Sequence, residues 1–227
     1  MISILSTKVL TPAQKNLLIH SGLAFVEYPA ITTEYLDVAI HSRPYDYCVF
    51  TSQQGVKAYI NYVNNPDAND QLEYGIKAFC VGEKTRSLLR EHAIEVVATG
   101  KNATALGEII SSTYNNCSFL LLSGNLRRDE LPDILKKNTI KYKEILVYRT
   151  LLNPKKITSQ FEGILFFSPS GVKSFHKQNI LKGATAFCIG ETTASALKKY
   201  TDKIIIASKP TVENVIVKAV NHFATYD

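Results

Sequence analysis

The sequence predicts an α/β protein made of two similar lobes, each a parallel sheet covered by helices. Short apolar runs alternate with helical patterns along the 227 residues, a length that suits one large domain or two small ones. The runs are apolar at consecutive positions, which is typical of parallel strands buried on both faces. In addition, a strand–turn–helix pattern occurs twice within residues 163–200 and twice more within residues 49–89.

The elements follow one another in a regular order, with a strand before each helix. The expected strands are residues 2–5, 23–28, 47–50, 78–81, 94–98, 119–122, 142–148, 163–167, 186–189 and 203–207. The expected helices lie at residues 11–22, 53–63, 85–91, around 106–110, around 131–135, after 168, after 190 and at 212–223.

The first helix has clear boundary signals. Thr11 is expected to be its N-cap, Pro12 its first residue and Gly22 its C-cap. Residues 29–46 and the segment around Asn153-Pro154 are expected to be connections, and residues 64–73 a polar loop.

The internal repeat gives the chain four parts in the order A, B, A′, B′. Residues 2–32 resemble residues 119–150, and residues 49–89 resemble the stretch that starts at Gly163. The spacing from Ser52 to Gly82 exceeds that from Ser168 to Gly190, and the extra residues fall in the polar loop. The pattern leaves open whether A packs with B or with B′. Two equivalent lobes follow, and the natural ligand site is expected where the carboxyl ends of their strands face each other.

The turns after the strands carry small and hydroxyl residues. They combine hydroxyl groups, free backbone N–H groups and a helix N-terminus, which together suit an anion. The candidate residues in these turns are Ser52, Thr85, Ser168, Ser170, Thr192 and Thr193.

Composition excludes several classes of protein. The net charge is +6 with no long basic block, so the charge alone fits an acidic small molecule as well as nucleic acid. No apolar run approaches the roughly 20 residues of a membrane span, and residues 1–8 do not resemble a signal peptide. The histidines show no metal-ligand spacing, and the four cysteines form no CxxC pair. We therefore expect a cytoplasmic protein with reduced core thiols, without a metal, a nucleic acid or a membrane as partner.

Six stretches together resemble the uroporphyrinogen-III synthase family, in the family's order and across essentially the whole chain. Each alone is weak, but six in register are specific. The stretches are Phe50-Thr-Ser-Gln-Gln-Gly-Val, Val81-Gly-Glu-Lys-Thr, Gly124-Asn-Leu-Arg-Arg-Asp-Glu-Leu-Pro, Ile145-Leu-Val-Tyr-Arg-Thr, Phe167-Ser-Pro-Ser-Gly-Val and Ile189-Gly-Glu-Thr-Thr-Ala.

The resemblance implies two flavodoxin-like lobes joined by two linker strands, with the active site in the cleft between the lobes. One lobe would hold residues 1–30 and 153–227, and the other residues 33–149. The linkers would lie near 29–32 and 149–154.

The resemblance also implies the reaction. Hydroxymethylbilane, a linear tetrapyrrole with eight carboxylates, would lose water and close with ring D inverted, giving uroporphyrinogen III for porphyrin and haem biosynthesis. No cofactor is implied. Tyr148 would assist the departure of hydroxide, because a phenol can donate a proton or hydrogen bond without being ionised. We expect a monomer that makes at most a transient contact with hydroxymethylbilane synthase.

Two further residues are expected to bind substrate. Asn125 follows the strand that ends at Gly124, and Arg128 is the member of the Arg127–Arg128 pair that we expect to face the site, since arginine binds carboxylate bidentately. Arg149, Lys84, Arg86 and Lys173 are weaker basic candidates.

Two other functions fit part of the pattern. A two-lobed protein that binds or senses a small anion without turnover would need the same turns. A nucleotide-dependent enzyme is suggested by Val81-Gly-Glu-Lys-Thr, yet neither GxxxxGK[ST] nor GxGxxG is present.

Overall fold

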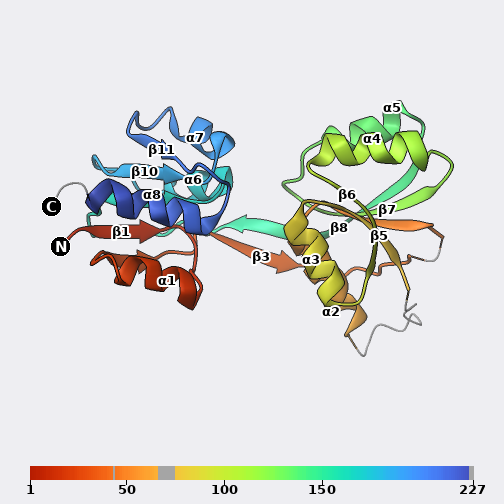
Figure 1. The fold of residues 1–227 in the computed structure, drawn as a ribbon, viewed down its shortest axis with the longest axis horizontal. Helices are drawn as coiled ribbons and strands as arrows, with labels where there is room; N and C mark the ends of the chain where they lie inside the picture. The colour runs from red at the N-terminus through yellow and green to blue at the C-terminus, as the bar shows by residue number, and fades with distance from the viewer. Residues whose placement is uncertain (43, 66–74, 225–227) are drawn as a thin grey trace. The chain divides into compact units, whose positions relative to one another are not determined.

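The structure is a computed structural model that describes residues 1–42, 44–65 and 75–224. Most of the predicted polar loop at 64–73 lies outside these residues. The chain divides into two compact units: unit 1 comprises Met1–Thr32 and Leu151–Asp227, and unit 2 comprises Thr33–Thr150. The predicted α/β class with two parallel-sheet lobes is confirmed (Figure 1).

Unit 1 has a five-stranded parallel sheet in the order β11-β10-β9-β1-β2. Its strands are β1 (Ser3–Ser6), β2 (Ala24–Glu27), β9 (Gly163–Phe166), β10 (Thr185–Cys188) and β11 (Ile204–Ile206). Its helices are α1 (Pro12–Ile19), α6 (Pro169–Phe175), α7 (Glu191–Leu197) and α8 (Val212–Ala224).

Unit 2 has a six-stranded sheet in the order β3-β8-β7-β4-β5-β6. Its strands are β3 (Ile31–Tyr35), β4 (Tyr47–Phe50), β5 (Lys77–Val81), β6 (Glu95–Gly100), β7 (Ser118–Gly124) and β8 (Lys141–Leu152), of which β3 begins before the unit boundary and β8 ends after it. Its helices are α2 (Gln53–Val63), α3 (Glu83–Glu91), α4 (Ala103–Thr113) and α5 (Glu130–Lys137).

The two sheets repeat one topology. Reading each from its last strand, β11-β10-β9-β1-β2 corresponds to β6-β5-β4-β7-β8. Part A of the sequence repeat (β1 and β2) therefore joins part B′, and part A′ (β7 and β8) joins part B, which answers the question that the pattern left open.

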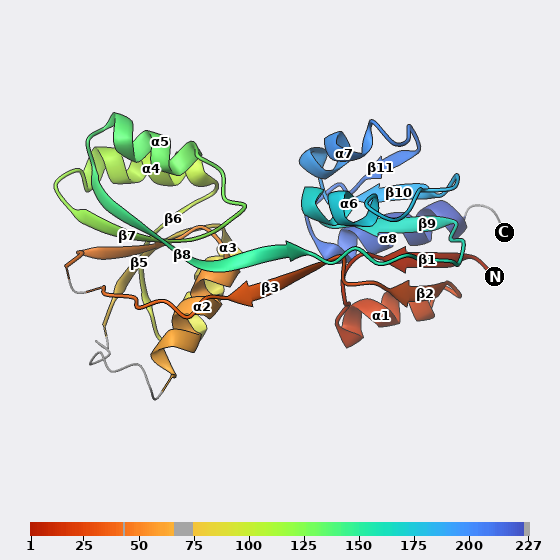
Figure 2. The ribbon, with the colours of Figure 1, turned by 180° about the vertical axis from the view of Figure 1, so that it is seen from behind.

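Both faces of each sheet are buried, as the continuous apolar runs predict. In unit 1, Leu5 packs with the residues of α6 and α7, whereas Ile4 packs with those of α1 and α8. In unit 2, Phe50 packs with residues of α2 and α3, whereas Val49 packs with those of α4 and α5. The helices α2 and α3 cover one face of this sheet, and α4 and α5 cover the other (Figures 1 and 2). Because helices cover both faces of each sheet, the side chains that can reach a ligand are those at the ends of the strands.

Two predicted boundaries are wrong. Residues 29–46 were expected to be a connection, but Ile31–Tyr35 forms β3, which pairs with β8 and extends the sheet. Its β-branched residues Ile31, Thr32 and Thr33 favour a strand, and its mixed exposure hides the apolar run that marks buried strands. Strand β8 correspondingly continues to Leu152 rather than ending at Tyr148.

The predicted start of the first helix is confirmed, but its end is not. Thr11 is the N-cap, with Pro12 next and a reciprocal capping box with Gln14. The helix ends at Ile19 with His20 as C-cap. Gly22, two residues further on, has φ +73° and turns the chain towards β2.

Candidate active site

In unit 2, the carboxyl ends of β4 and β7 lie side by side, and the end of β7 pairs with the middle of β8 at Tyr148. This brings together Ser52 and Asn125, which follow parallel strands, and Tyr148, which lies within β8. The hydroxyl oxygens of Ser52 and Tyr148 are 2.9 Å apart. The structure thus joins the predicted catalytic tyrosine to one of the predicted binding residues.

Tyr148 keeps its place because Gly124 has no side chain. A Cβ at Gly124 would lie 2.2 Å from Cζ of Tyr148 and 2.6 Å from its hydroxyl oxygen. The two residues are register partners on β7 and β8, next to an irregularity in the pairing after Ser123. The phenol ring therefore lies directly over the glycine, which the sequence pattern did not single out as a site residue.

Ser52 is the N-cap of α2 and accepts a hydrogen bond from Gly55 N–H at 3.3 Å. One hydroxyl oxygen thus serves both the helix and the tyrosine. Ser52 can accept from Gly55 and still donate its own proton to the phenol oxygen of Tyr148, or instead accept the phenol proton.

Asn125 is engaged with the backbone of β8. Its Oδ1 accepts from Thr150 N–H at 2.8 Å, and its Nδ2 donates to Thr150 O at 3.3 Å. The side chain is exposed. Asn125 therefore holds the backbone of β8 at Thr150, two residues after Tyr148, while its side chain remains exposed to solvent.

Tyr35 and Gln54 belong to the same cluster, and sequence reasoning missed both. Tyr35 Oη donates to Gln54 Oε1 at 2.7 Å, at the second residue of α2. Burial raises the pKa of Tyr35, and the neighbouring Tyr148 adds to this shift. The β-branched residues before Tyr35 were the signal that could have placed it on a strand beside β8.

Thr85 lies in the first turn of α3 and is 4% exposed. Gln53 Nε2 donates to Lys84 O at 3.0 Å and so joins the start of α2 to the start of α3. The Thr85 side chain is therefore near the edge but covered by its own unit.

The adjacent arginines Arg127 and Arg128, which precede α5, have different surroundings. Arg127 binds Glu144 and Asp129, with Nη2 donating to Glu144 Oε2 at 2.8 Å. Burial by itself raises the pKa of Glu144, but the hydrogen bonds from Arg127 and Ser123 outweigh it and lower the pKa overall. Arg128 is 65% exposed and lies 3.5 Å from Glu130. Arg127 thus has its partners within the fold, and Arg128 is the arginine with an accessible guanidinium.

In unit 1, Ser168 repeats the part that Ser52 plays in unit 2. It is the N-cap of α6 and accepts from Gly171 N–H at 3.0 Å. Its Oγ lies 3.1 Å from Oγ of Ser170, so the structure brings these two predicted residues together. Both side chains are half-buried.

The two threonines that open α7 differ in exposure. Thr192 is exposed, whereas Thr193 is 1% exposed and its N–H donates to Gly190 O. Thr192 can therefore meet a ligand directly. Thr193 is the unit 1 counterpart of the buried Thr85.

Tyr28 is the unit 1 counterpart of Tyr148 in unit 2. Each tyrosine lies beside the residue that directly follows a serine on the neighbouring strand of its own sheet. Tyr28 is 3% exposed, and its hydroxyl is engaged by Asn153 O and Lys155 N–H. The repeat has thus placed one tyrosine in a structural role and left the other half-exposed at the edge.

Within residues 1–42, 44–65 and 75–224, no group of three His, Cys, Asp or Glu side chains is arranged to hold a metal ion. In the same ranges, no helix is long and apolar enough to cross a membrane.

The repeated parallel α/β unit places the chain in the class of two-lobed α/β proteins. The family model described as Uroporphyrinogen-III synthase HemD matches residues 13–216. The chain therefore belongs to the uroporphyrinogen-III synthase family, as its sequence motifs predicted.

Individual relatives agree with this assignment. A curated protein of Ruminiclostridium josui named porphyrin biosynthesis protein HemD is 29% identical over 220 residues, which cover 87% of this chain and 43% of that protein. The chain thus spans less than half the length of this curated relative.

Two solved structures share the fold. The uroporphyrinogen-III synthetase of Helicobacter pylori 26695 matches with a TM-score of 0.76 and 22% identity, over 98% of this chain and 100% of that one. A mutant uroporphyrinogen III synthase of the extremely thermophilic bacterium Thermus thermophilus matches with a TM-score of 0.64 and 16% identity, over the whole of both chains.

Proposed function

We propose that this chain is a uroporphyrinogen-III synthase, which cyclises hydroxymethylbilane with inversion of ring D and loss of water. Family membership supports the reaction. The observation that carries the chemistry is the hydroxyl pair at the edge of unit 2, where Tyr148 and Ser52 lie 2.9 Å apart.

The pyrrole nitrogens of the substrate supply the electrons that expel hydroxide, so the protein needs only a weak acid at the leaving oxygen. Tyr148 donates a hydrogen bond to that oxygen as the C–O bond breaks. Ser52 donates to the phenol oxygen in turn and stabilises the negative charge that develops there. The substituted carbon of the far pyrrole, ring D, attacks the resulting azafulvene cation and forms a spiro intermediate. This intermediate fragments and closes again through the other α-carbon of ring D, which inverts the ring. That carbon then loses its proton, and this proton and the expelled hydroxide together make up the water that is lost.

The remaining task is to hold a flexible chain of four rings in one geometry, which contributes much of the rate in reactions of this kind. We assign the carboxylates of the substrate to the strand edges of both units. The exposed or half-buried groups there are Ser168, Ser170, Thr192, Asn125 and Arg128. Thr85 and Thr193 are buried, and we assign them a structural role in packing the first turns of α3 and α7 against their own units.

We further propose that the enzyme acts in the cytoplasm as a monomer without a cofactor, receiving its substrate through a transient contact with hydroxymethylbilane synthase. The cysteines support a reducing compartment. All four are free thiols, and burial raises the pKa of Cys48 and Cys188 to about 12, which keeps these two protonated and unreactive.

A coupled assay tests the function. Hydroxymethylbilane is generated by its own synthase, this protein is added, and the oxidised products are separated into type I and type III isomers. Uncatalysed closure gives type I, so type III product that depends on this protein supports the proposal. Type I product alone, from protein shown to be folded, would refute it and favour the anion-binding alternative.

A further inference from the structure

The sheet of unit 2 contains a strand that has no counterpart in the sheet described for unit 1. Both sheets share one five-strand topology, and β3 is the added member at the edge of unit 2, beside β8. Figures 1 and 2 show β3 and β8 running in opposite directions, and an antiparallel edge strand is a common addition to a parallel sheet. The added strand therefore gives β8 a set of neighbouring side chains that the repeat does not supply.

Tyr35 ends β3 alongside Tyr148. The N–H of Leu36 donates to the carbonyl oxygen of Val147 at 3.0 Å. On antiparallel strands this bond places Tyr35, the residue before Leu36, opposite Tyr148, the residue after Val147, and residues opposite each other share one face of the sheet. Burial raises the pKa of Tyr35 and the neighbouring Tyr148 adds to this shift, so the Tyr35 hydroxyl stays protonated and able to donate.

The hydroxyl of Tyr35 holds the side chain of Gln54. Tyr35 Oη donates to Gln54 Oε1 at 2.7 Å, and this hydrogen bond is exposed to solvent. Because the amide oxygen accepts from Tyr35, the Nε2 group of Gln54 is the end directed away from the tyrosine, and it carries two N–H donors. Tyr35 itself is 37% exposed. The pair thus presents an oriented donor group that a ligand can reach.

Gln54 occupies a position that both units place beside their capping serine. It is the second residue of α2 after the cap Ser52, just as Ser170 is the second residue of α6 after the cap Ser168. Ser170 Oγ lies 3.1 Å from Oγ of its own cap. In unit 2 the cap bonds the hydroxyl of Tyr148, and the longer side chain of Gln54 reaches β3. Gln54 therefore lies two residues from the serine that contacts the proposed acid.

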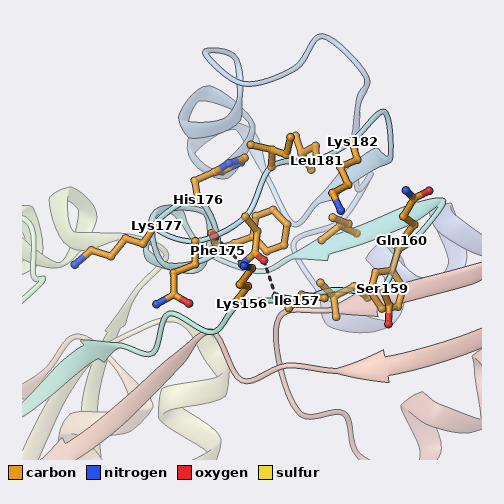
Figure 3. Close-up of a pocket in the computed structure, with 15 residues that line it drawn as sticks. Lys156, Ile157, Ser159, Gln160, Phe175, His176, Lys177, Leu181 and Lys182 are labelled. Atoms are coloured by element: carbon orange, nitrogen blue, oxygen red, sulfur yellow. Dashed lines mark hydrogen bonds between the residues drawn. The ribbon is translucent and has the colours of Figure 1, made fainter.

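A pocket of about 420 Å³ in unit 1 is built differently (Figure 3). It lies between the segment 156–161 and the end of α6, and its floor includes Phe175 and Leu181, which are at most 7% exposed. His176 Nε2 in its wall makes no hydrogen bond within the described residues, but the atom is buried and out of a ligand's reach. The charged side chains that line it are the exposed Lys156, Lys177 and Lys182. Gln54, by contrast, is both accessible and held in one orientation.

We propose that Gln54, oriented by Tyr35, binds a carboxylate on the substrate ring that carries the leaving hydroxymethyl group. The inference rests on the proposed function, which places Tyr148 at the leaving oxygen. The same pyrrole ring carries an acetate and a propionate, so a carboxylate lies close to that oxygen and to the side chains beside Tyr148. This carboxylate accepts a charge-assisted hydrogen bond from the Nε2 group of Gln54. Gln54 contacts the substrate, and Tyr35 is a positioning residue that acts through Gln54.

Steady-state kinetics of type III formation from freshly prepared hydroxymethylbilane test the proposal. Gln54→Ala should raise KM about fivefold, because the donor to the carboxylate is lost, and Gln54→Glu should raise it about tenfold or more, because a like charge replaces the donor. In both variants kcat should change less than about twofold, as expected for an interaction that binds substrate and transition state equally. Gln54→Glu keeps an acceptor for Tyr35, so its melting temperature should not fall. Gln53→Glu is the matched control: it adds the same charge one residue earlier in the first turn of α2 and should change KM less than about twofold.

Tyr35→Phe separates the positioning role from a purely structural one. In the parent chain it should raise KM about threefold with kcat unchanged, since Gln54 loses its fixed orientation. In the Gln54→Ala background it should raise KM no further, because the residue through which Tyr35 acts is gone. A further rise in the double variant, or equal KM values for Gln54→Glu and Gln53→Glu, would overturn the proposal. Type III product from Gln54→Glu at the parent KM removes only the role of Gln54, whereas a parent chain that yields type I product alone refutes the proposed function itself.

Discussion

The phenol oxygen of Tyr148 lies 2.9 Å from the hydroxyl oxygen of Ser52, which also caps α2. The capping serine is thereby placed to accept or donate one proton at the tyrosine without giving up its bond to Gly55. The same serine hydroxyl therefore stabilises the start of α2 and contacts the proposed acid, Tyr148. Substitutions at Tyr148 and its neighbours can test this role.

Tyr148→Phe should lower kcat for type III product by about 10- to 100-fold, because the proton or hydrogen bond to the leaving hydroxide is lost. The free energy of unfolding should change by less than about 1 kcal/mol, since the ring remains over Gly124. Isomer analysis under saturating substrate gives the first quantity and urea unfolding the second. A variant that turns over at the parent rate would exclude the acid role.

Tyr28→Phe is the matched control for that experiment. Tyr28 is buried, and its hydroxyl is bonded to Asn153 O and Lys155 N–H. Removal of the hydroxyl should cost about 1 to 2 kcal/mol of stability, while kcat stays near the parent value. The two tyrosines should thus show opposite patterns in activity and stability.

Gly124→Ala should reduce turnover by displacing the ring of Tyr148, since the new methyl group would lie 2.2 Å from Cζ. A double-mutant cycle with Tyr148→Ala separates this from a general effect on the strand. Once the ring is gone the methyl group has room, so adding Gly124→Ala to Tyr148→Ala should cost no further activity. A further loss in the double variant would show that Gly124 acts by another route.

The threonines at the start of α7 should separate binding from stability. Thr192→Val should raise KM by about threefold to tenfold if the exposed hydroxyl meets a carboxylate, with little change in melting temperature. Thr193→Val replaces a 1% exposed side chain and should lower the melting temperature while KM stays the same. Initial rates and thermal unfolding of the two variants test both expectations, and a Thr192→Val enzyme with the parent KM would remove Thr192 from the site.

The ion pair of Arg127 and Glu144 should make unit 2 sensitive to acid. The folded-state pKa of Glu144 is lowered, because the hydrogen bonds from Arg127 and Ser123 outweigh burial. Its contribution is therefore complete above the unfolded-state pKa, about 4.3, and is lost as the pH falls through the lower folded-state value. Glu144→Gln should be less stable than the parent at pH 7 by about 1.5 to 3 kcal/mol. The difference should shrink below about pH 4 in urea unfolding, and a difference that is constant with pH would contradict this origin.

The sequence predicted the α/β class, most strands and the fourfold order of the repeat, because buried parallel strands and helical stripes are local patterns. The repeat pattern alone could not decide which parts share a sheet, since the pairing of β1 with β9 joins residues about 160 positions apart; only the family resemblance implied the division. For the candidate site, Ser52 follows from the strand–turn–helix pattern and Tyr148 from the family resemblance, and their roles stay predictions. The position of the Tyr148 ring over Gly124 depends on register across two strands and has no local pattern.

Other residues of the candidate site lie in segments that are exposed or only partly buried, where the hydrophobic pattern is weakest. Tyr35 was missed because β3 has no continuous apolar run. The burial of Thr85 and Thr193 was not visible either, because a threonine in the first turn of a helix can face solvent or the sheet. The pocket beside Lys182 arises from a segment without regular structure that crosses the end of α6.

The topology also determines the order in which the two units can be completed during synthesis. Unit 2 is one continuous segment, Thr33–Thr150, whereas unit 1 needs strands from both ends of the chain. On the ribosome, β1 and β2 emerge before unit 2 but have no β9 to pair with until the whole of unit 2 has been made. A unit 2 that has already folded shortens the effective loop between residues 32 and 151, because β3 and β8 pair at its ends. A folded unit 2 thus lowers the entropy cost of pairing β1 and β2 with the later strands of unit 1.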